Sequence, residues 1–212
     1  PAPSYPGPAE GHDYARQLWQ YAREAAGTPV ETYLRNRGLT DTPPPTLRYQ
    51  PALKYTPSGL HLPGMVAAVQ ASDRRLVALH RTFLRLDGRG KAQVASPRMW
   101  LGAFGDGAIR LAPAAPELGI GEGIETCLAA MELSGVGAWA AGSANRLAHV
   151  ALPSEVEHVH VFRDADAEGA AGANAAAQRF TAEGRRVTVH SPPDGCNDFA
   201  NVIEAEAGQE VV

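Results

Sequence analysis

Short apolar segments alternate with helix-like segments in the second half of the chain, and this alternation limits the possible folds more than any other feature. Strands are predicted at 118–121, 136–141, 156–162 and 186–190, and helices at 124–133, 145–150, 167–182 and 198–206. Strands that alternate with helices form parallel sheets through right-handed crossover connections. We therefore expect an α/β fold in which helices flank a parallel sheet over residues 113–208.

The first half has a different pattern. Residues 1–9 are rich in Pro and Gly and are predicted to form a flexible lead, followed by short helices at 13–26 and 29–37. A run of three prolines then breaks the chain, and residues 46–112 contain β-forming segments separated by turns. We expect residues 1–45 to be a lead with short helices, and residues 46–112 to be a smaller, basic α+β subdomain that precedes the parallel sheet.

Charge divides the chain in the same place. Residues 1–112 contain 14 Lys and Arg against 8 Asp and Glu, whereas residues 113–212 contain 5 against 15. A basic region can hold a polyanion, and an acidic region can hold divalent cations. Two ordinary solvated surfaces would give the same numbers, so charge alone does not decide between these interpretations.

Composition excludes several classes of protein. No run of 18 apolar residues is present, so we expect no membrane span, and the first residues lack the basic and apolar regions of a signal peptide. The two cysteines, Cys127 and Cys196, form no C-x-x-C pair and are too few for a disulfide framework. A zinc ribbon is therefore not expected, and the reducing cytoplasm is the expected location.

Acidic residues follow three of the predicted strands. Glu122 follows the first strand, Asp164 and Asp166 follow the third, and Asp198 comes after the last. The carboxyl ends of parallel strands meet at one edge of a sheet, where sites commonly form. Carboxylates that converge repel one another, and a divalent cation removes this penalty. Oxygen ligands favour Mg²⁺ or Mn²⁺, and such ions stabilise the charge that develops in phosphoryl transfer.

Each of these patterns has a simpler interpretation when it stands alone. An Asp-x-Asp pair is also typical of a helix N-cap beside a solvated acid. The combination of Glu122 with the pair, about 40 residues apart across strand–helix–strand–helix–strand, favours a metal site. Gly123 would leave room for a phosphate beside Glu122. The histidines show no metal-binding spacing, so His158 and His160 on a predicted strand are expected to be structural.

Three segments together resemble a known family. Residues 120–126, Ile-Gly-Glu-Gly-Ile-Glu-Thr, resemble the glutamate motif of the Toprim domain, and residues 161–169, Val-Phe-Arg-Asp-Ala-Asp-Ala-Glu-Gly, resemble its Asp-x-Asp motif. Residues 193–199 resemble the acidic segment that follows in bacterial DnaG-type primases. More loosely, residues 78–102 resemble the basic β-rich subdomain that precedes Toprim in those enzymes. The arrangement is most similar to Toprim primases of phages and integrative mobile elements.

The resemblance implies roles for the acids. It implies that Glu122 acts in acid–base catalysis or orders metal, that Asp164 and Asp166 bind Mg²⁺ or Mn²⁺, and that Asp198 is a further ligand. The sequence departs from the family pattern at Glu125, where the family usually has Asp, and at Asn201, where a further acid is expected.

The resemblance also implies a nucleic-acid surface on the basic half. Arg81, Arg85, Lys91 and Arg98 would contact template or incoming nucleotide, and Trp100 could stack on a base. Each of these residues could equally be an ordinary surface or core residue. The implied partners are single-stranded DNA and nucleoside triphosphates, with a replicative helicase or flanking helicase and zinc-binding modules as further candidates.

The function that these features favour is that of a DNA primase core. Such a core makes short RNA primers on single-stranded DNA by metal-dependent nucleotidyl transfer. A Toprim nuclease is the alternative within catalysis, and a non-catalytic nucleic-acid-binding Toprim module is the alternative outside it. The sequence leaves open the template preference, the primer length, the number of metal ions and the oligomeric state.

Overall fold

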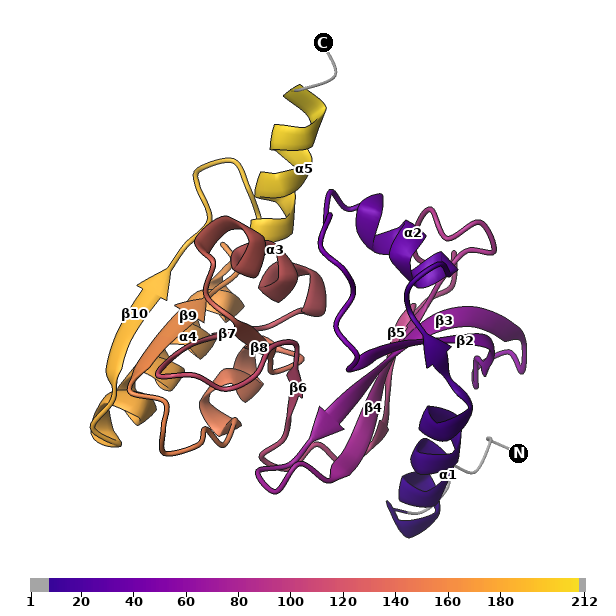
Figure 1. The fold of residues 1–212 in the computed structure, drawn as a ribbon, viewed down its shortest axis with the longest axis horizontal. Helices are drawn as coiled ribbons and strands as arrows, with labels where there is room; N and C mark the ends of the chain where they lie inside the picture. The colour runs from indigo at the N-terminus through magenta and orange to yellow at the C-terminus, as the bar shows by residue number, and fades with distance from the viewer. Residues whose placement is uncertain (1–7, 210–212) are drawn as a thin grey trace. The chain divides into compact units, whose positions relative to one another are not determined.

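A computed structural model describes residues 8–209, with side chains described for residues 13–206. The chain forms two compact units. The N-terminal unit comprises Pro1–Asn36 and Thr42–Gly105, and the C-terminal unit comprises Arg37–Asp41 and Asp106–Val212. The indigo-to-magenta and the orange-to-yellow parts of Figure 1 correspond to most of these two units.

An antiparallel sheet covered by helices makes up the N-terminal unit. Its elements are α1 (Pro8–Tyr21), β1 (Arg23–Glu24), α2 (Pro29–Arg35), β2 (Leu47–Lys54), β3 (His61–Gln70), β4 (Leu76–Phe83) and β5 (Arg98–Gly102). The strands pair in chain order, and every one of these pairs is antiparallel. The apolar side of α1 packs on this sheet, in a core with Leu53, Val66, Leu79 and Phe83.

Local signals explain where α2 begins, whereas long-range pairing decides where α1 ends. Thr28 caps α2 by accepting a hydrogen bond from the Val30 amide at 3.2 Å, with Pro29 in the first turn, as the sequence predicts. The predicted helix over 13–26 is wrong at its end, because Arg23 pairs with Tyr49 across β1 and β2. Of the predicted flexible lead, residues 1–7 lie outside the described residues, and residues 8 and 9 already belong to α1.

The C-terminal unit contains a largely parallel sheet with helices on both faces (Figure 1). Its elements are β6 (Ala108–Arg110), β7 (Glu117–Gly121), α3 (Ile124–Ser134), β8 (Ala138–Ala140), the 3₁₀ helix η1 (Ala144–His149), β9 (His158–Phe162), α4 (Ala167–Ala182), β10 (Arg186–His190) and α5 (Phe199–Gln209). The strand order is β6-β8-β7-β9-β10. Only β6 runs antiparallel to its neighbour among these pairs, so the predicted α/β class is confirmed.

Side chains alternate between the two faces of this sheet. Val159 and Val161 of β9 pack with Ala173 and Phe180 of α4 in one core. Phe162 lies on the opposite face, against Phe199 at the start of α5. Gly121 lies next to Cys127 of α3 on that face, since an added Cβ there would be 2.8 Å from the Cys127 sulfur.

Two predicted elements of this unit differ in detail. The helix predicted at 145–150 is the 3₁₀ helix Ala144–His149, and the strand predicted at 136–141 shortens to Ala138–Ala140. Arginines from α4 and from its end hold the loop that follows η1. Arg179 donates to the Ala148 and Val150 carbonyls, and Arg185 donates to carbonyls of residues 152, 153 and 156. Along the part of the chain that the structure describes, no helix has both the length and the apolar character needed to cross a membrane.

Candidate active site

Glu122 leaves the carboxyl end of β7 beside the end of β9. The two strands are neighbours, with Gly121 opposite Phe162. The Glu122 carbonyl accepts a hydrogen bond from the Gly142 amide at 2.7 Å, which fixes the backbone beyond β8. The segment after β7 and the segment after β9 therefore emerge side by side, which brings Glu122 and the Asp-x-Asp pair to one edge of the sheet.

The Glu122 carboxyl group is electrostatically destabilised in its charged form. Burial, followed by the charges of Asp164 and Asp166, raises its pKa from 4.5 to about 7. Its Oε1 atom is buried and has no hydrogen-bond partner. Buried polar atoms normally have partners, so a buried, unpartnered carboxylate oxygen beside two more acids is an arrangement that a bound cation would stabilise.

Asp164 lies between the two segments. The Thr126 hydroxyl donates to Asp164 Oδ1 at 3.5 Å, which joins α3 to the loop after β9. The Arg163 guanidinium donates to the Asp164 main-chain carbonyl at 3.2 Å and to the Ser191 hydroxyl at 2.8 Å. The loop around Asp164 is thus tied to α3 on one side and to the end of β10 on the other.

Asp166 combines two features that the sequence presents as alternatives. It is the N-cap of α4, because its Oδ1 accepts a hydrogen bond from the Gly169 amide at 2.7 Å. It is also exposed, and its charge contributes to the raised pKa of Glu122. The cap uses one carboxylate oxygen, and the other oxygen remains available for a further ligand.

Asp198 belongs to a loop held against the Asp-x-Asp loop. The Ala165 amide donates to the Asn197 carbonyl at 2.8 Å, which places the residue before Asp198 next to the residue between the two aspartates. Asp198 Oδ1 itself accepts from the Asn201 amide at 2.8 Å. The Asn201 side chain accepts from the Asn197 amide and donates to Glu204, so the residue in place of the expected acid holds this loop together.

Two glycines beside the acids differ in what they tolerate. An added Cβ at Gly169 would lie 2.6 Å from the Asp164 carbonyl oxygen and 2.9 Å from Glu122 Oε1. At Gly123 it would meet only Thr126 Oγ1 at 3.5 Å and Glu125 Oε2 at 3.9 Å, which are ordinary contacts. Packing therefore requires glycine at 169, whereas no neighbouring atom of the chain requires glycine at 123.

The sequence pattern gives no site role to three residues that the structure places beside the acids. Thr126 contacts Asp164, Glu168 adds to the raised pKa of Glu122, and Glu125 is a buried acid in the first turn of α3. Because α3 begins at Ile124, Glu125 and Thr126, which follow Glu122 by three and four residues, lie in its first turn near the strand ends. That spacing is the signal by which Glu125 and Thr126 could have been found.

On the N-terminal unit, Arg98 and Trp100 lie on the same side of β5. Arg98 is exposed, and Trp100 is 40% exposed. The indole ring of Trp100 contacts the His80 ring at 4.3 Å and the Phe104 ring at 4.2 Å. A fixed, half-exposed aromatic ring beside an exposed guanidinium can accept a stacked base and a phosphate.

Arg81 and Lys91 lie in less exposed surroundings. Arg81 is only 5% exposed, and its guanidinium donates to the Trp100 carbonyl at 3.0 Å. Lys91 is half-buried, and its ammonium group lies 6.0 Å from the Tyr33 ring. Arg81 therefore supports the strand that carries Trp100, whatever else it contacts.

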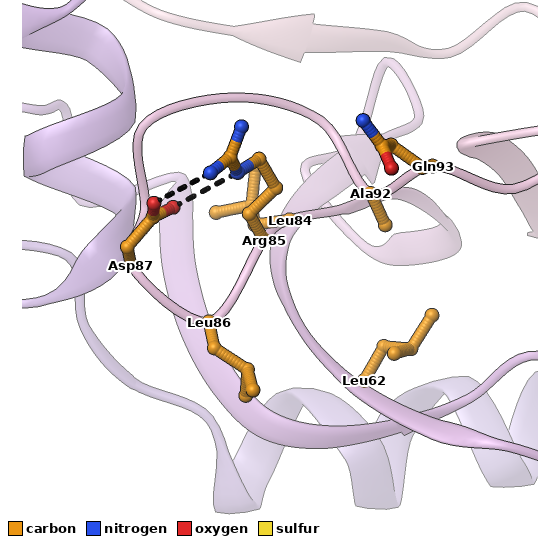
Figure 2. Close-up of a pocket in the computed structure, with 7 residues that line it drawn as sticks. All are labelled: Leu62, Leu84, Arg85, Leu86, Asp87, Ala92 and Gln93. Carbon is orange, nitrogen blue, oxygen red and sulfur yellow. Dashed lines mark hydrogen bonds and ion pairs between the residues drawn. The ribbon is translucent and has the colours of Figure 1, made fainter.

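Arg85 lines a hollow of about 410 Å³ on the N-terminal unit (Figure 2). Its guanidinium makes a bidentate ion pair with Asp87, with Nε–Oδ1 and Nη2–Oδ2 distances of 3.2 and 2.8 Å. Leu86 between them is 86% exposed. Any anion that binds Arg85 has to compete with Asp87.

Comparison with known families divides the chain between residues 111 and 117, a few residues after the boundary between the two structural units. Residues 117–208 match the Toprim domain family, and residues 9–111 match a domain of unknown function, DUF7146. The C-terminal unit, with a largely parallel sheet flanked by helices and acids at its carboxyl edge, matches the Toprim domain family over residues 117–208.

Solved structures identify the fold of the chain more specifically as that of DnaG-type primase catalytic cores. A DnaG catalytic core is similar with a TM-score of 0.60 at 14% identity, over 95% of this chain and 78% of that one. The zinc-binding and RNA polymerase domains of the Aquifex aeolicus primase give 0.60 at 14% identity, over 97% of this chain and 60% of that one. A DnaG primase catalytic domain bound to single-stranded DNA gives 0.53 at 13% identity, over 95% and 76%. No protein of curated function matches the sequence.

Proposed function

We propose that the chain is a primase core that synthesises short RNA primers on single-stranded DNA. The observation that carries this proposal is the convergence of Glu122 with Asp164 and Asp166, which leaves Glu122 Oε1 buried without a partner and its pKa raised to about 7. Repulsion of this kind costs stability unless the site binds a cation or takes up a proton. The primase fold of the chain makes nucleotidyl transfer the reaction class that fits these acids best.

Asp164, Asp166 and Asp198 would hold Mg²⁺ or Mn²⁺ together with Glu122. The donor set fits these ions, because it consists of carboxylate oxygens from adjacent loops. When bound, such an ion neutralises charge on the phosphates of a nucleoside triphosphate. The Thr126 hydroxyl and the Asp166 cap hold Asp164 and Asp166 in place, and Gly123 leaves space for a phosphate next to Glu122.

Glu122 has a second role in this proposal. In the metal-free site the pKa of its carboxyl group is about 7, so this group takes up or releases a proton near neutral pH, which is the property of a general acid or base. It can accept the proton of an attacking hydroxyl group as well as order the metal. The template would lie along the basic N-terminal unit, where Arg98 provides charge and Trp100 a stacking surface.

Primer synthesis on single-stranded DNA with labelled ribonucleotides, with Mn²⁺ or Mg²⁺, tests the proposal. The unmodified chain should make short RNA products, and Asp164→Asn should abolish them while the protein stays folded. Glu155→Gln is the matched control, because Glu155 is an exposed acid that precedes β9, at the opposite edge of the sheet. Degradation of the DNA in place of RNA synthesis would support the nuclease alternative, and DNA binding without either activity would support a non-catalytic module.

A further inference from the structure

A second group of metal-ligating side chains lies at the other end of the same strands. Glu117 begins β7 and is paired with His158, the first residue of β9. His160, two residues further on, points to the same face of the sheet. Glu122 follows β7 five residues after Glu117, which is roughly 17 Å along an extended strand. The acidic site and this group therefore occupy opposite ends of the sheet.

We propose that Glu117, His158 and His160 form a separate metal site for a borderline transition-metal cation of the Zn²⁺ class. The distance from Glu117 Oε1 to His158 Nδ1 is 3.6 Å, and that from Glu117 Oε2 to His160 Nε2 is 3.5 Å. The ligand atoms of the three residues lie within 4.8 Å of one another. Ligand atoms around tetrahedral zinc, with bonds of about 2.0–2.1 Å, are separated by roughly 3.4 Å.

Each histidine has the hydrogen-bonding pattern of a metal ligand. His158 Nε2 contacts the Thr188 hydroxyl at 2.8 Å, and His160 Nδ1 contacts His190 Nε2 at 2.9 Å. The other ring nitrogen of each histidine is buried and faces a Glu117 carboxylate oxygen at 3.5–3.6 Å. Ligating histidines usually donate the proton of one ring nitrogen to a neighbouring group, so that the other nitrogen is free for the metal. Thr188 and His190 of β10 supply these neighbours.

One side of the group is open to solvent. Glu117 is largely exposed, so the fourth position of a tetrahedral ion would face solvent. An ion bound there would connect β7 directly to β9. It would also connect both strands to β10, through the contacts of the two histidines with Thr188 and His190.

The sequence pattern alone predicts structural roles for the two histidines. Only the register of β7 against β9 brings Glu117 to them. The nitrogen ligands distinguish this site from the acidic one, because Mg²⁺ prefers oxygen.

Zn²⁺ binding to the full chain, measured by calorimetry in the presence of excess millimolar Mg²⁺, tests the proposal. One equivalent should bind and raise the melting temperature. Glu117→Gln and His160→Gln should each weaken binding at least tenfold, and Thr188→Val should weaken it by about 10–100-fold without changing the ligands. His149→Ala, an exposed histidine of η1, is the matched control and should bind Zn²⁺ normally.

Co²⁺ provides a second, spectroscopic readout. The bound ion should show the intense visible absorption of tetrahedral geometry, and Glu117→Gln should abolish it while circular dichroism stays unchanged. The Asp164→Asn variant should keep both Zn²⁺ binding and this spectrum, which separates the site from the proposed primase function. Absence of Zn²⁺ binding by the unmodified chain, or binding that survives both Glu117→Gln and His160→Gln, would overturn the proposal.

Discussion

The position that a Cβ atom would take on Gly169 lies 2.9 Å from Glu122 Oε1, so the first turn of α4 and the carboxylate after β7 fit together without space for a methyl group. The same position is 2.6 Å from the Asp164 carbonyl oxygen, which is backbone and cannot move aside easily. The glycine in the Asp-x-Asp motif is therefore a packing requirement of the site.

Gly169→Ala should destabilise the fold by about 1–3 kcal/mol, the usual cost of overpacking, and should disturb the Glu122 carboxylate. Gly123→Ala is the contrast, because its Cβ would make ordinary contacts at a φ of −99°. It should leave stability unchanged or slightly higher, and reduce nucleotide binding if a phosphate occupies the space. Urea unfolding and nucleotide titration of both variants measure this. Equal stability of the two variants would contradict the packing argument.

Stability without metal should fall as pH rises from 4.5 to about 7, and Glu122 is the cause. Its folded-state pKa is raised from 4.5 to about 7, so between these values the folded chain binds more protons than the unfolded chain. The free energy of unfolding therefore decreases with pH in this window and levels off above it. Glu122→Gln should remove that decrease and be more stable than the unmodified chain at pH 8. Urea unfolding in a chelator at several pH values tests this, and parallel pH profiles for the two proteins would refute it.

Two replacements of Asp166 should distinguish its capping role from its metal-binding role. Asparagine is as good an N-cap as aspartate, so Asp166→Asn should keep the stability of α4 while lowering Mn²⁺ affinity and primer synthesis. Asp166→Ala should lose both the N-cap and the metal ligand, with a stability cost of about 1 kcal/mol. Thermal melting and Mn²⁺ calorimetry on both variants make the comparison. Normal metal binding by Asp166→Asn would leave Asp166 with the capping role alone.

Replacement of exposed Arg98 should weaken single-stranded DNA binding alone, whereas replacement of Arg81 should also affect stability. Arg98→Ala should weaken binding and flatten the slope of log affinity against log salt by about 0.7, because one phosphate is no longer neutralised. Arg81→Ala should also lower stability, because the buried guanidinium supports the Trp100 carbonyl. Lys54→Ala, a change of an exposed cation on β2, is the control. Fluorescence anisotropy over a range of salt concentrations measures the slope, and an unchanged slope for Arg98→Ala would place the DNA elsewhere.

Sequence pattern predicts the elements whose signals are local. The helix over 167–182 and the strand over 186–190 have the predicted bounds, because an apolar period of helical spacing and a terminal glycine are local properties. The end of α1 could not be predicted in this way. Arg23 joins a strand only because Tyr49, 26 positions along the chain, pairs with it.

The same distinction applies to the site. Strand ends locate Glu122, Asp164 and Asp166 at one edge once a parallel sheet is assumed. The hydrogen bond from Thr126 to Asp164 and the ion pair that occupies Arg85 depend on three-dimensional distances that residue spacing does not contain, whereas the cap made by Asp166 is one of the two interpretations that the sequence offers. Glu117 lies opposite His158 because of the register between β7 and β9. The alternation of side chains along a strand does not distinguish registers that differ by two residues.

Four arginines of the C-terminal unit bear on the order in which a metal ion and a nucleotide would bind at the proposed site. Arg146, Arg163, Arg179 and Arg185 all donate to main-chain carbonyl oxygens of the unit, so their charges are directed inward. A triphosphate that approached the acidic edge would meet the carboxylates of Glu122, Asp164 and Asp166, and no arginine is among the groups that set the pKa of Glu122. In the proposed function the cation would therefore bind first or together with the nucleotide, and at low metal concentration the rate of nucleotide entry should follow the occupancy of the metal site.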